Sequence, residues 1–266
     1  MAIKIALDAG HGLKTSGKQT PDGIKEWTLN DKVRDKVVKI LSAYDCEIIH
    51  TDNNEGTTDE ALGTRLSKYK KAGVAAFVSI HHNAYKGTWC NATGVEVFTD
   101  KNPTPGDSKL ANLIYTRLVK YTGLKARGIK KEDWYVINQD TIPAVLVEGG
   151  FMDCKKDYKV ITSDAGQEAY AKAVAEGLIE FLGLKKKTTI KVPTKPTTTK
   201  PKIDYYKRYF GTSTSLVDAL KSLKIGATFT NRKKIAKANG VKLYVGTAAQ
   251  NNRLLNLLKK GKLVKP

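Results

Sequence analysis

The stretch IKIALDAGHG, residues 3–12, decides the fold, because an apolar run of strand length ends abruptly in a histidine between two glycines. Residues 3–8 have the composition of a buried strand. Gly10 and Gly12, on either side of His11, allow the backbone to approach another group closely. We therefore predict that the chain opens with a strand that leads into a loop.

Strand-like and helix-like segments alternate from this start to residue 184. Strands are predicted over 46–50, 74–80, 94–99 and 144–147, and helices over 28–43, 65–72, 108–121 and 165–182. Strands that alternate with helices imply an α/β sheet with both faces covered. We predict one α/β domain over residues 1–184.

The remainder of the chain differs in composition. Residues 185–203, KKKTTIKVPTKPTTTKPKI, contain Lys, Thr and Pro but no acidic residue, which predicts an extended linker. Helical spacing returns in residues 204–266, with helices predicted from a cap at Ser215 to Leu223, over 231–238 and over 247–260. We predict a small, mainly helical C-terminal domain there.

The net charge of +20 belongs almost wholly to the tail. Residues 1–184 hold 25 Lys and Arg against 24 Asp and Glu, whereas residues 185–266 hold 21 basic groups and only Asp204 and Asp218. Such a tail should bind a polyanion, namely nucleic acid, an anionic membrane, or the teichoic acids and carboxylates of a bacterial wall.

The cysteines and the first residues indicate where the chain is made. Cys46, Cys90 and Cys154 lack the spacing of a zinc knuckle or a redox motif, so free thiols from a reducing cytosol are expected, with one disulfide as the alternative. No charged leader with a cleavage site is visible, and no run approaches the roughly 20 apolar residues of a membrane span. We expect synthesis in the cytoplasm without a signal peptide, and no membrane insertion.

Four polar residues stand where predicted elements begin or end: His11, Glu26, His81 and Glu148. Strand ends are where open α/β sheets usually bind ligands. Two imidazoles and one carboxylate form a set that binds zinc and leaves a fourth position open, and a second carboxylate can relay a proton to a leaving amine. Each residue also has a structural explanation, such as a hydrogen-bonded core histidine, and the pattern alone leaves both open.

Six segments then occur in one order: LDAGHG (7–12), Glu26 with Trp27, the stretch from Thr51 to Arg65, SIHHNA (79–84), GVEVF (94–98) and PAVLVEGGF (143–151). Together they resemble the zinc-dependent N-acetylmuramoyl-L-alanine amidases of the type 3 family, over about residues 1–184. The resemblance implies a twisted mixed sheet flanked by helices. It also implies cleavage of the amide between the lactyl group of muramic acid and the L-alanine of the stem peptide, with Zn²⁺ as cofactor. By the same resemblance, the zinc ligands are His11, Glu26 and His81, and the catalytic carboxylate is Glu148.

Neighbouring polar residues receive weaker assignments. Successive side chains on a strand point to opposite faces, so His81 and not His82 is expected to reach the metal. His82 stands where the family usually has a small residue, and it either lines the cleft or packs. His82 and Asn83 are weak candidates for substrate binding. His50 is interpreted as structural, and Arg65 as holding a loop or a helix end.

The order of the domains indicates a function for the basic tail. An amidase domain, a Lys/Thr/Pro linker and a basic module resemble phage endolysins and autolysins of Gram-positive hosts, in which the last module tethers the enzyme to its polymer. The partners expected are therefore peptidoglycan and an anionic wall polymer, and not nucleic acid.

Three alternatives remain at this stage. Because no leader is visible, we expect a phage endolysin that reaches the wall through a separate membrane pore, rather than a bacterial autolysin of the same activity. The rivals from other classes are a zinc hydrolase acting on a small amide, and a basic nucleic-acid-binding protein with an inactive amidase-like domain.

Overall fold

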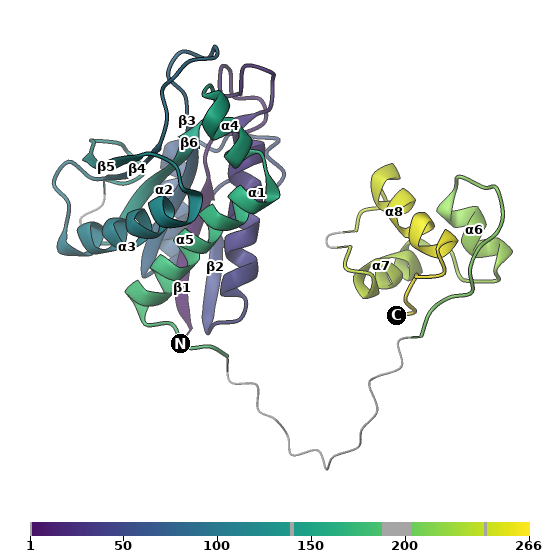
Figure 1. Cartoon of the computed structure of the whole chain (residues 1–266). Coiled ribbons are helices and arrows are strands. Elements are labelled where there is room, and N and C mark those ends of the chain that lie inside the picture. The colour runs from purple at the N-terminus through teal and green to yellow at the C-terminus, as the bar shows by residue number, and fades with distance from the viewer. Residues whose placement is uncertain (1, 139–140, 188–203, 242–243) are drawn as a thin grey trace. The chain divides into compact units, whose positions relative to one another are not determined.

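The computed structural model describes residues 2–138, 141–187, 204–241 and 244–266. The chain divides into two compact units, Met1–Thr189 and Ile190–Pro266 (Figure 1). Most of the predicted linker, residues 188–203, lies outside the described residues. Lys185 and Lys187 form backbone hydrogen bonds with Asp45 and Ala43, so the regular structure of the first unit extends past residue 184.

A six-stranded mixed sheet forms the centre of the first unit (Figure 1). Its strands are β1 (Ile3–Ala9), β2 (Cys46–His50), β3 (Ala76–Asn83), β4 (Val95–Thr99), β5 (Ala126–Lys131) and β6 (Ala144–Phe151). They lie in the order β2-β1-β3-β6-β4-β5, and every neighbouring pair is parallel except β4 and β6. The predicted α/β fold with a mixed sheet is confirmed.

Helices cover both faces of this sheet. They are α1 (Glu26–Leu41), α2 (Leu62–Ala72), α3 (Pro105–Thr122), α4 (Lys155–Ile161) and α5 (Asp164–Leu182). Leu7, Val78 and Ile80 belong to the core formed with α1, α3 and α5, whereas Phe77 packs on the opposite side against Tyr69 of α2. The period of two along each strand therefore decides which side chains meet which helices.

A buried ion pair fixes the end of β1 beside the loop that carries His11. Asp8 accepts hydrogen bonds from Arg65 (2.6 Å), Thr51 (2.7 Å) and Ser79 (2.7 Å). Arg65 also donates to the carbonyl oxygens of Ala9 and His11 and, at the start of α2, of Glu60. The prediction that Arg65 holds a loop and a helix end is confirmed.

Replacing Asp8 by Asn is expected to lower the free energy of unfolding of the first unit by about 3–5 kcal/mol, because it leaves the buried Arg65 charge with only the partly exposed Asp59 as a counter-ion. All three tryptophans lie in this unit, so tryptophan fluorescence during urea unfolding measures it selectively. Asp35→Asn, at an exposed carboxylate on α1 whose partner Arg34 keeps its ion pairs with Asp31 and Asp52, is the control and should change stability by less than about 1 kcal/mol.

The same substitution should have a defined pH dependence. Burial alone would raise the pKa of Asp8, but the Arg65 charge and the hydroxyls of Ser79 and Thr51 hold that pKa below its ordinary value of 3.8. The stabilisation is therefore fully present above that value and is lost as the pH falls through the lower folded pKa. The difference between wild type and Asp8→Asn should stay constant at neutral and mildly acidic pH and shrink below about pH 4. A constant difference down to pH 2 would refute the assignment.

Three helices form the C-terminal unit: α6 (Leu216–Ser222), α7 (Phe229–Ala238) and α8 (Ala248–Lys259). Each begins at a hydroxyl cap, from Ser215, Thr228 and Thr247 respectively. They share an apolar core of their own that includes Leu220, Ile235 and Leu254, which confirms a small helical unit beyond the sheet. None of the helices in the described part of the chain has the length and apolar character needed to cross a membrane.

Candidate metal centre

The loop after β1 turns His11 toward β3. His11 has φ of 66°, a left-handed conformation that non-glycine residues rarely adopt and that clusters at functional sites. At Gly10, an added Cβ would lie 2.0 Å from the imidazole of His81, so only glycine permits this approach. The two rings meet edge to face with centroids 4.9 Å apart.

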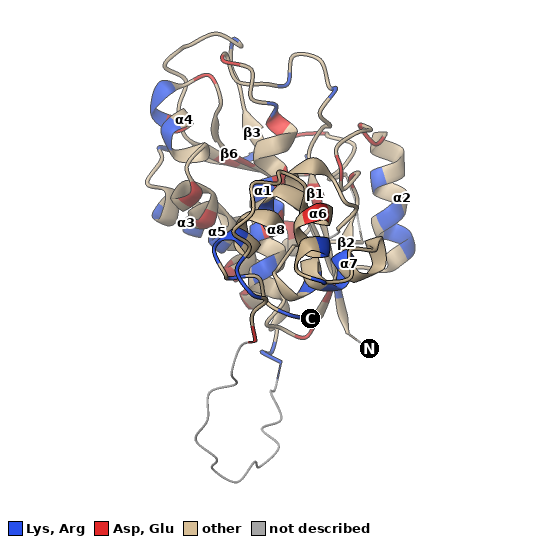
Figure 2. Cartoon of the chain, turned by 90° about the vertical axis from the view of Figure 1, so that its right-hand side faces the viewer, with Lys and Arg blue, Asp and Glu red and all other residues tan. Residues whose placement is uncertain are grey.

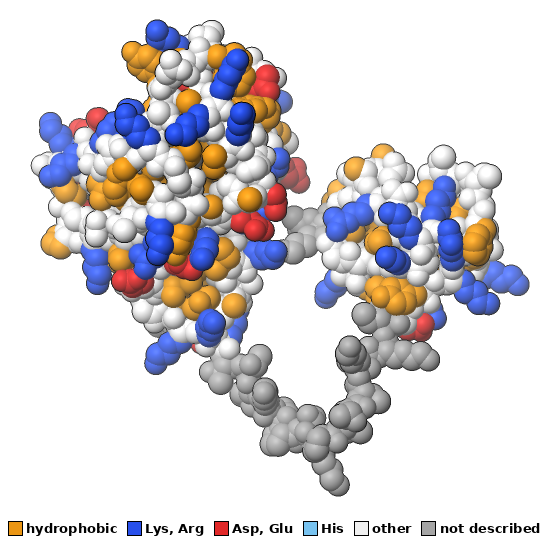
Figure 3. Space-filling model, viewed as in Figure 1, with side chains coloured by type: hydrophobic (Ala, Val, Ile, Leu, Met, Phe, Trp, Pro, Cys, Tyr) orange, Lys and Arg blue, Asp and Glu red, His pale blue; other side chains and the backbone are white. Residues whose placement is uncertain are grey.

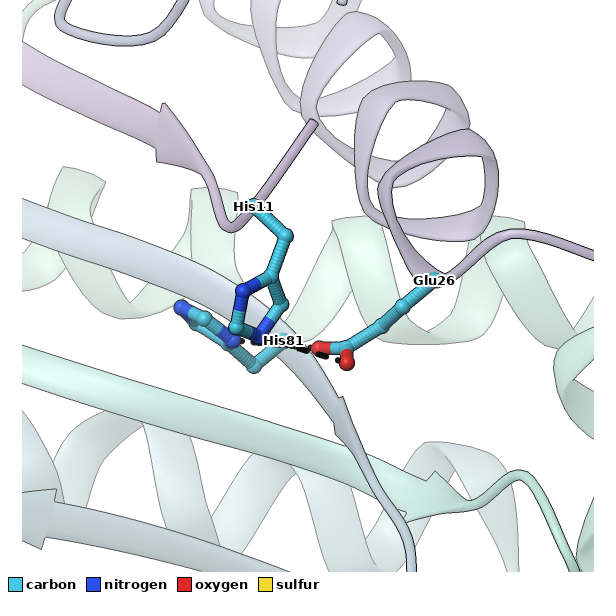
Figure 4. A group of neighbouring side chains, drawn as sticks. All are labelled: His11, Glu26 and His81. Atoms are coloured by element: carbon cyan, nitrogen blue, oxygen red, sulfur yellow. Dashed lines mark hydrogen bonds and ion pairs between the residues drawn. The ribbon is translucent and has the colours of Figure 1, made fainter. Parts of the chain in front are cut away.

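Glu26, the first residue of α1, points its carboxylate toward both imidazoles (Figure 4). Its Oε2 is 3.3 Å from His11 Nε2 and its Oε1 is 3.1 Å from His81 Nδ1. One ligand atom from each of the three side chains lies within 4.8 Å of the other two. Residues separated by 15 and 55 positions in the chain are thus brought to one point.

The ionised Glu26 suits a cation. Burial alone would lower the pKa of His81, but its hydrogen bond to Glu26 raises that pKa above its ordinary value, so an ion that binds there displaces the proton of His81. Burial lowers the pKa of His11 to about 4, so its imidazole is neutral and has a lone pair to donate near neutral pH. Burial alone would raise the pKa of Glu26, but its hydrogen bond to His81 and the nearby positive charges lower that pKa to about 2. Glu26 is therefore an ionised carboxylate that is almost completely buried.

Glu148 lies on β6 directly beside His81 of β3 in the register of the sheet. Burial raises its pKa to about 8. Its Oε2 has no hydrogen-bond partner among the residues that the structure describes, which is unusual for a buried carboxylate oxygen. Glu148 lines one cavity together with His11, Glu26 and His81, so a group bound there would meet all four.

These observations test whether a metal ion fits. Two imidazoles and an ionised carboxylate are the donor types of a three-ligand zinc site, and such a set leaves a position open for substrate. The buried carboxylate of Glu148, whose Oε2 has no partner among the described residues, lines the same cavity as the three donors. The residues present fit a divalent metal ion.

The structure places the weaker candidates as follows. The His82 side chain lies among the helices, with Nδ1 2.7 Å from Asn30 Oδ1 and its ring edge against Tyr170, so His81 and His82 do occupy opposite faces of β3. The Asn83 side chain accepts a hydrogen bond from the Ala84 backbone. Both residues border the cavity that contains Glu148, and their contact with substrate stays a prediction.

Asn30 is a polar residue of this centre that the sequence analysis did not single out. It is completely buried, and its Nδ2 donates to Glu26 Oε1 (3.3 Å) and to the carbonyl oxygen of Gly10 (3.1 Å). Its Oδ1 is the partner of His82. The sequence could have indicated Asn30 through its position one helical turn after Glu26, because residues four apart on a helix are neighbours.

Replacing Asn30 by Ala is expected to weaken metal binding about 10- to 100-fold, because groups that orient a metal ligand have effects of that size. Asn30→Asp should also weaken it, because a carboxylate cannot donate the hydrogen bond that orients Glu26 Oε1. The measurement is titration of the metal-free protein with zinc against a competing chelator, which counts only the folded, binding-competent protein.

Asn112→Ala, on the exposed surface of α3, is the control and should bind metal like the wild type. If Asn30→Ala lost thermal stability but kept wild-type zinc affinity, the residue would have a packing role alone.

A mixed α/β sheet that gathers two histidines, a glutamate and a second buried carboxylate at its carboxyl edge defines a metal-site hydrolase. The chain belongs to the N-acetylmuramoyl-L-alanine amidase family Amidase_3, whose model matches residues 5–180. Its activity is that of an N-acetylmuramoyl-L-alanine amidase on peptidoglycan, as predicted.

Individual relatives agree with this family. The chain is 36% identical over 198 residues to an endolysin of Bacillus phage SPP1, which covers 73% of this chain and 72% of that protein. It is 29% identical over 178 residues to N-acetylmuramoyl-L-alanine amidase LytC of Bacillus subtilis, covering 66% of this chain but only 35% of the relative. The catalytic domain of the amidase CwlV from Bacillus (Paenibacillus) polymyxa superposes with a TM-score of 0.63 at 29% identity, covering 69% of this chain and 99% of that structure.

Proposed function

We propose that the protein is a zinc-dependent phage endolysin that cleaves the amide between N-acetylmuramic acid and L-alanine and so lyses the bacterial wall. The observation that carries this proposal is the meeting of His11, Glu26 and His81 within 4.8 Å, beside the buried carboxylate of Glu148. The similarity to the endolysin of phage SPP1 supports a lytic enzyme released from a host cytoplasm rather than an autolysin.

His11, Glu26 and His81 would hold the ion. When bound, zinc supplies a Lewis acid that polarises a carbonyl group and makes water a stronger acid. The two imidazoles give neutral donors, and Glu26 offsets one unit of the ion's charge. Asn30 and the left-handed turn at His11 keep these donors oriented toward one another before any ion arrives.

Glu148 is the general base and acid of the proposed reaction. Its carboxylate accepts a proton from the attacking water, and the same oxygen then donates that proton to the amine nitrogen of L-alanine as the carbon–nitrogen bond breaks. Its surroundings suit this exchange, because burial places its pKa at about 8, close enough to neutral pH for the group both to accept and to donate a proton. Its buried Oε2 also has no competing hydrogen bond among the described residues. The products are a lactyl carboxylate on the sugar and a stem peptide with a free amino terminus.

The decisive experiment is mass spectrometry of sacculi digested by the purified protein with zinc. Free stem peptides that begin at L-alanine, together with intact glycan strands, are expected. New reducing sugar ends, or cleavage within the stem peptide, would contradict the proposed bond. Cleavage of soluble amides without any clearing of Gram-positive wall suspensions would favour a hydrolase of small amides instead.

The C-terminal unit is proposed to bind an anionic wall polymer. Residues 204–266 hold 14 Lys and Arg against Asp204 and Asp218, and Figure 2 marks basic positions on its helices. The face of this unit visible in Figure 3 shows many basic side chains and very few acidic ones. A separate apolar core means that this surface does not depend on the amidase unit for its fold.

Ending the chain after Lys187 is expected to lower binding to wall sacculi at least 10-fold at low salt, while kcat/KM on a soluble muropeptide stays unchanged. Tethering raises the effective concentration of enzyme at its polymer, and only the tethered substrate benefits. Co-sedimentation with sacculi measures the binding, which should weaken as salt screens the charges.

Duplex DNA is the control polyanion. Full-length protein that binds DNA more tightly than it binds sacculi, with no loss of wall clearing after truncation, would overturn wall binding in favour of nucleic acid.

A further inference from the structure

Two cavities meet at the metal-ligand group, and His11, His81, Trp134 and Leu146 border both of them. The first, about 310 Å³, is bordered by Leu62, Trp134 and Tyr135, and we name it the aromatic cavity. The second, about 610 Å³, is bordered by Lys18, Tyr85 and Lys86 as well as by Glu148, and we name it the basic cavity. Both reach His11 and His81, so a substrate that spans the centre enters both.

One wall of the aromatic cavity is apolar and fixed, and Asp59 and Asp133 on its border disfavour a carboxylate there. Trp134 packs against Phe98 with ring centroids 4.4 Å apart, and its carbonyl oxygen accepts a backbone hydrogen bond from Ile137. The Tyr69 hydroxyl donates to the carbonyl oxygen of Val136 (3.0 Å), which ties the same segment to α2. Trp134 nevertheless leaves 37% of its surface exposed and Tyr135 leaves 56%. Large aromatic faces that are held in place but exposed suit a flat, uncharged ring such as a pyranose.

The basic cavity also contains the carboxylates of Glu26 and Glu148, but two lysines border it and neither Asp59 nor Asp133 does. Lys18 and Lys86 border it, and neither forms an ion pair with a carboxylate in the described ranges of the chain. The segment around Lys86 is held by Asp153, whose buried Oδ2 accepts the backbone N–H groups of Tyr85, Lys86 and Gly87. A fixed backbone with unpaired ammonium groups suits a ligand that carries carboxylates.

The two halves of the substrate differ in the same way. On the sugar side of the scissile amide lies an uncharged N-acetylated pyranose, and on the other side lies a peptide that carries free carboxylates. Because the amide must sit at the centre, the two halves leave it in different directions. Charge complementarity then selects one of the two possible orientations.

We propose that the cleft binds peptidoglycan in one direction, with the muramic acid ring in the aromatic cavity against Trp134 and the stem-peptide carboxylates in the basic cavity near Lys18 and Lys86. This inference rests on the proposed amidase function. Trp134, Lys18 and Lys86 are thereby specificity-determining residues for the two halves of the substrate.

Three soluble substrates test the orientation. The parent is N-acetylmuramoyl-L-alanyl-D-glutamate with its peptide carboxylates free, the second has the α-carboxylate amidated, and the third replaces the muramic sugar by a lactoyl group. For Lys18→Met with Lys86→Met, the ratio of kcat/KM between the free and amidated substrates should fall about 10-fold at low salt, and the fall should shrink at high salt. For Trp134→Leu, the ratio between the parent and the lactoyl substrate should fall by about the same factor.

Lys120→Met, on the surface of α3 and outside both cavities, is the control and should keep both ratios. Wild-type values of both kcat/KM ratios in the cavity variants would overturn the proposed direction. So would the reverse pattern, in which the lysine variant changes the ratio between the parent and the lactoyl substrate and Trp134→Leu changes the ratio between the free and amidated substrates. Cleavage of the parent by wild type at a different bond would instead contradict the amidase function itself, so the two failures are distinguishable.

Discussion

Replacing Glu148 by Gln is expected to lower kcat by about 10²–10⁴-fold while the protein keeps one metal ion per chain. The amide has nearly the shape of the carboxylate, so packing on β6 is preserved, but it cannot accept a proton from water and pass it to the leaving amine. KM should change little, because the substitution removes an interaction needed in the transition state. The measurements are turnover of a soluble muropeptide and elemental analysis of the same preparation.

Glu132→Gln, at an exposed position after β5, is the control and should retain full turnover. Normal turnover by Glu148→Gln would remove Glu148 from the reaction. Loss of the metal from Glu148→Gln would show instead that its carboxylate helps to hold the ion, which would change its role from proton transfer to binding.

The sheet could be predicted from the sequence wherever burial made it apolar. The runs that became β1, β3 and β6 are buried on both faces, so their composition alone marked them as strands. The same reasoning predicted that β3 and β6 end at Ile80 and Val147. In the structure β3 continues to Asn83 and β6 to Phe151. These extensions are held by pairing between the two strands, and polar side chains at a site give no apolar signal.

Two elements of the first unit were not predicted, for different physical reasons. β5, with the sequence ARGIKK, is an edge strand with mostly exposed side chains, and charged edges are how sheets avoid pairing with other chains. α4 has only seven residues and begins without a side-chain cap, so neither periodicity nor capping marks it.

The centre was only partly accessible from sequence. The glycines around His11 and the polar residues at strand ends indicated which residues could form a site. Spacing along the chain, however, cannot show that His11, Glu26 and His81 converge. That step came from the family resemblance, and the distances of the structure now support it independently. The opposite faces of His81 and His82 followed from strand geometry alone. Asn30 was not predicted as part of the centre, because in the sequence a buried polar residue on a helix only interrupts the apolar face. Its role is visible only from its hydrogen-bond partners in the structure.

His11 offers the clearest test of the metal centre, because its side chain is partly exposed and its removal leaves no buried charge without a partner. His11→Ala is expected to raise the dissociation constant for zinc at least about 100-fold and to reduce turnover to near background, since two remaining donors bind zinc far less tightly than three. By contrast, removing Glu26 would leave His81 without the carboxylate that it faces, so a folding defect could imitate loss of metal. Zinc titration and turnover should be measured on one preparation whose tryptophan fluorescence matches the wild type.

The matched control is His50→Ala, on β2 and outside the metal group, which should keep both zinc and turnover. Chelation followed by added zinc should restore activity to the wild type and to His50→Ala, but only poorly to His11→Ala. These three proteins separate the possible causes of inactivity, because a general histidine effect would also appear at His50 and an irreversible folding defect would persist after zinc is returned. Stoichiometric zinc in His11→Ala would mean that the three side chains lie together for a structural reason, and the proposed hydrolysis would then lack its ion.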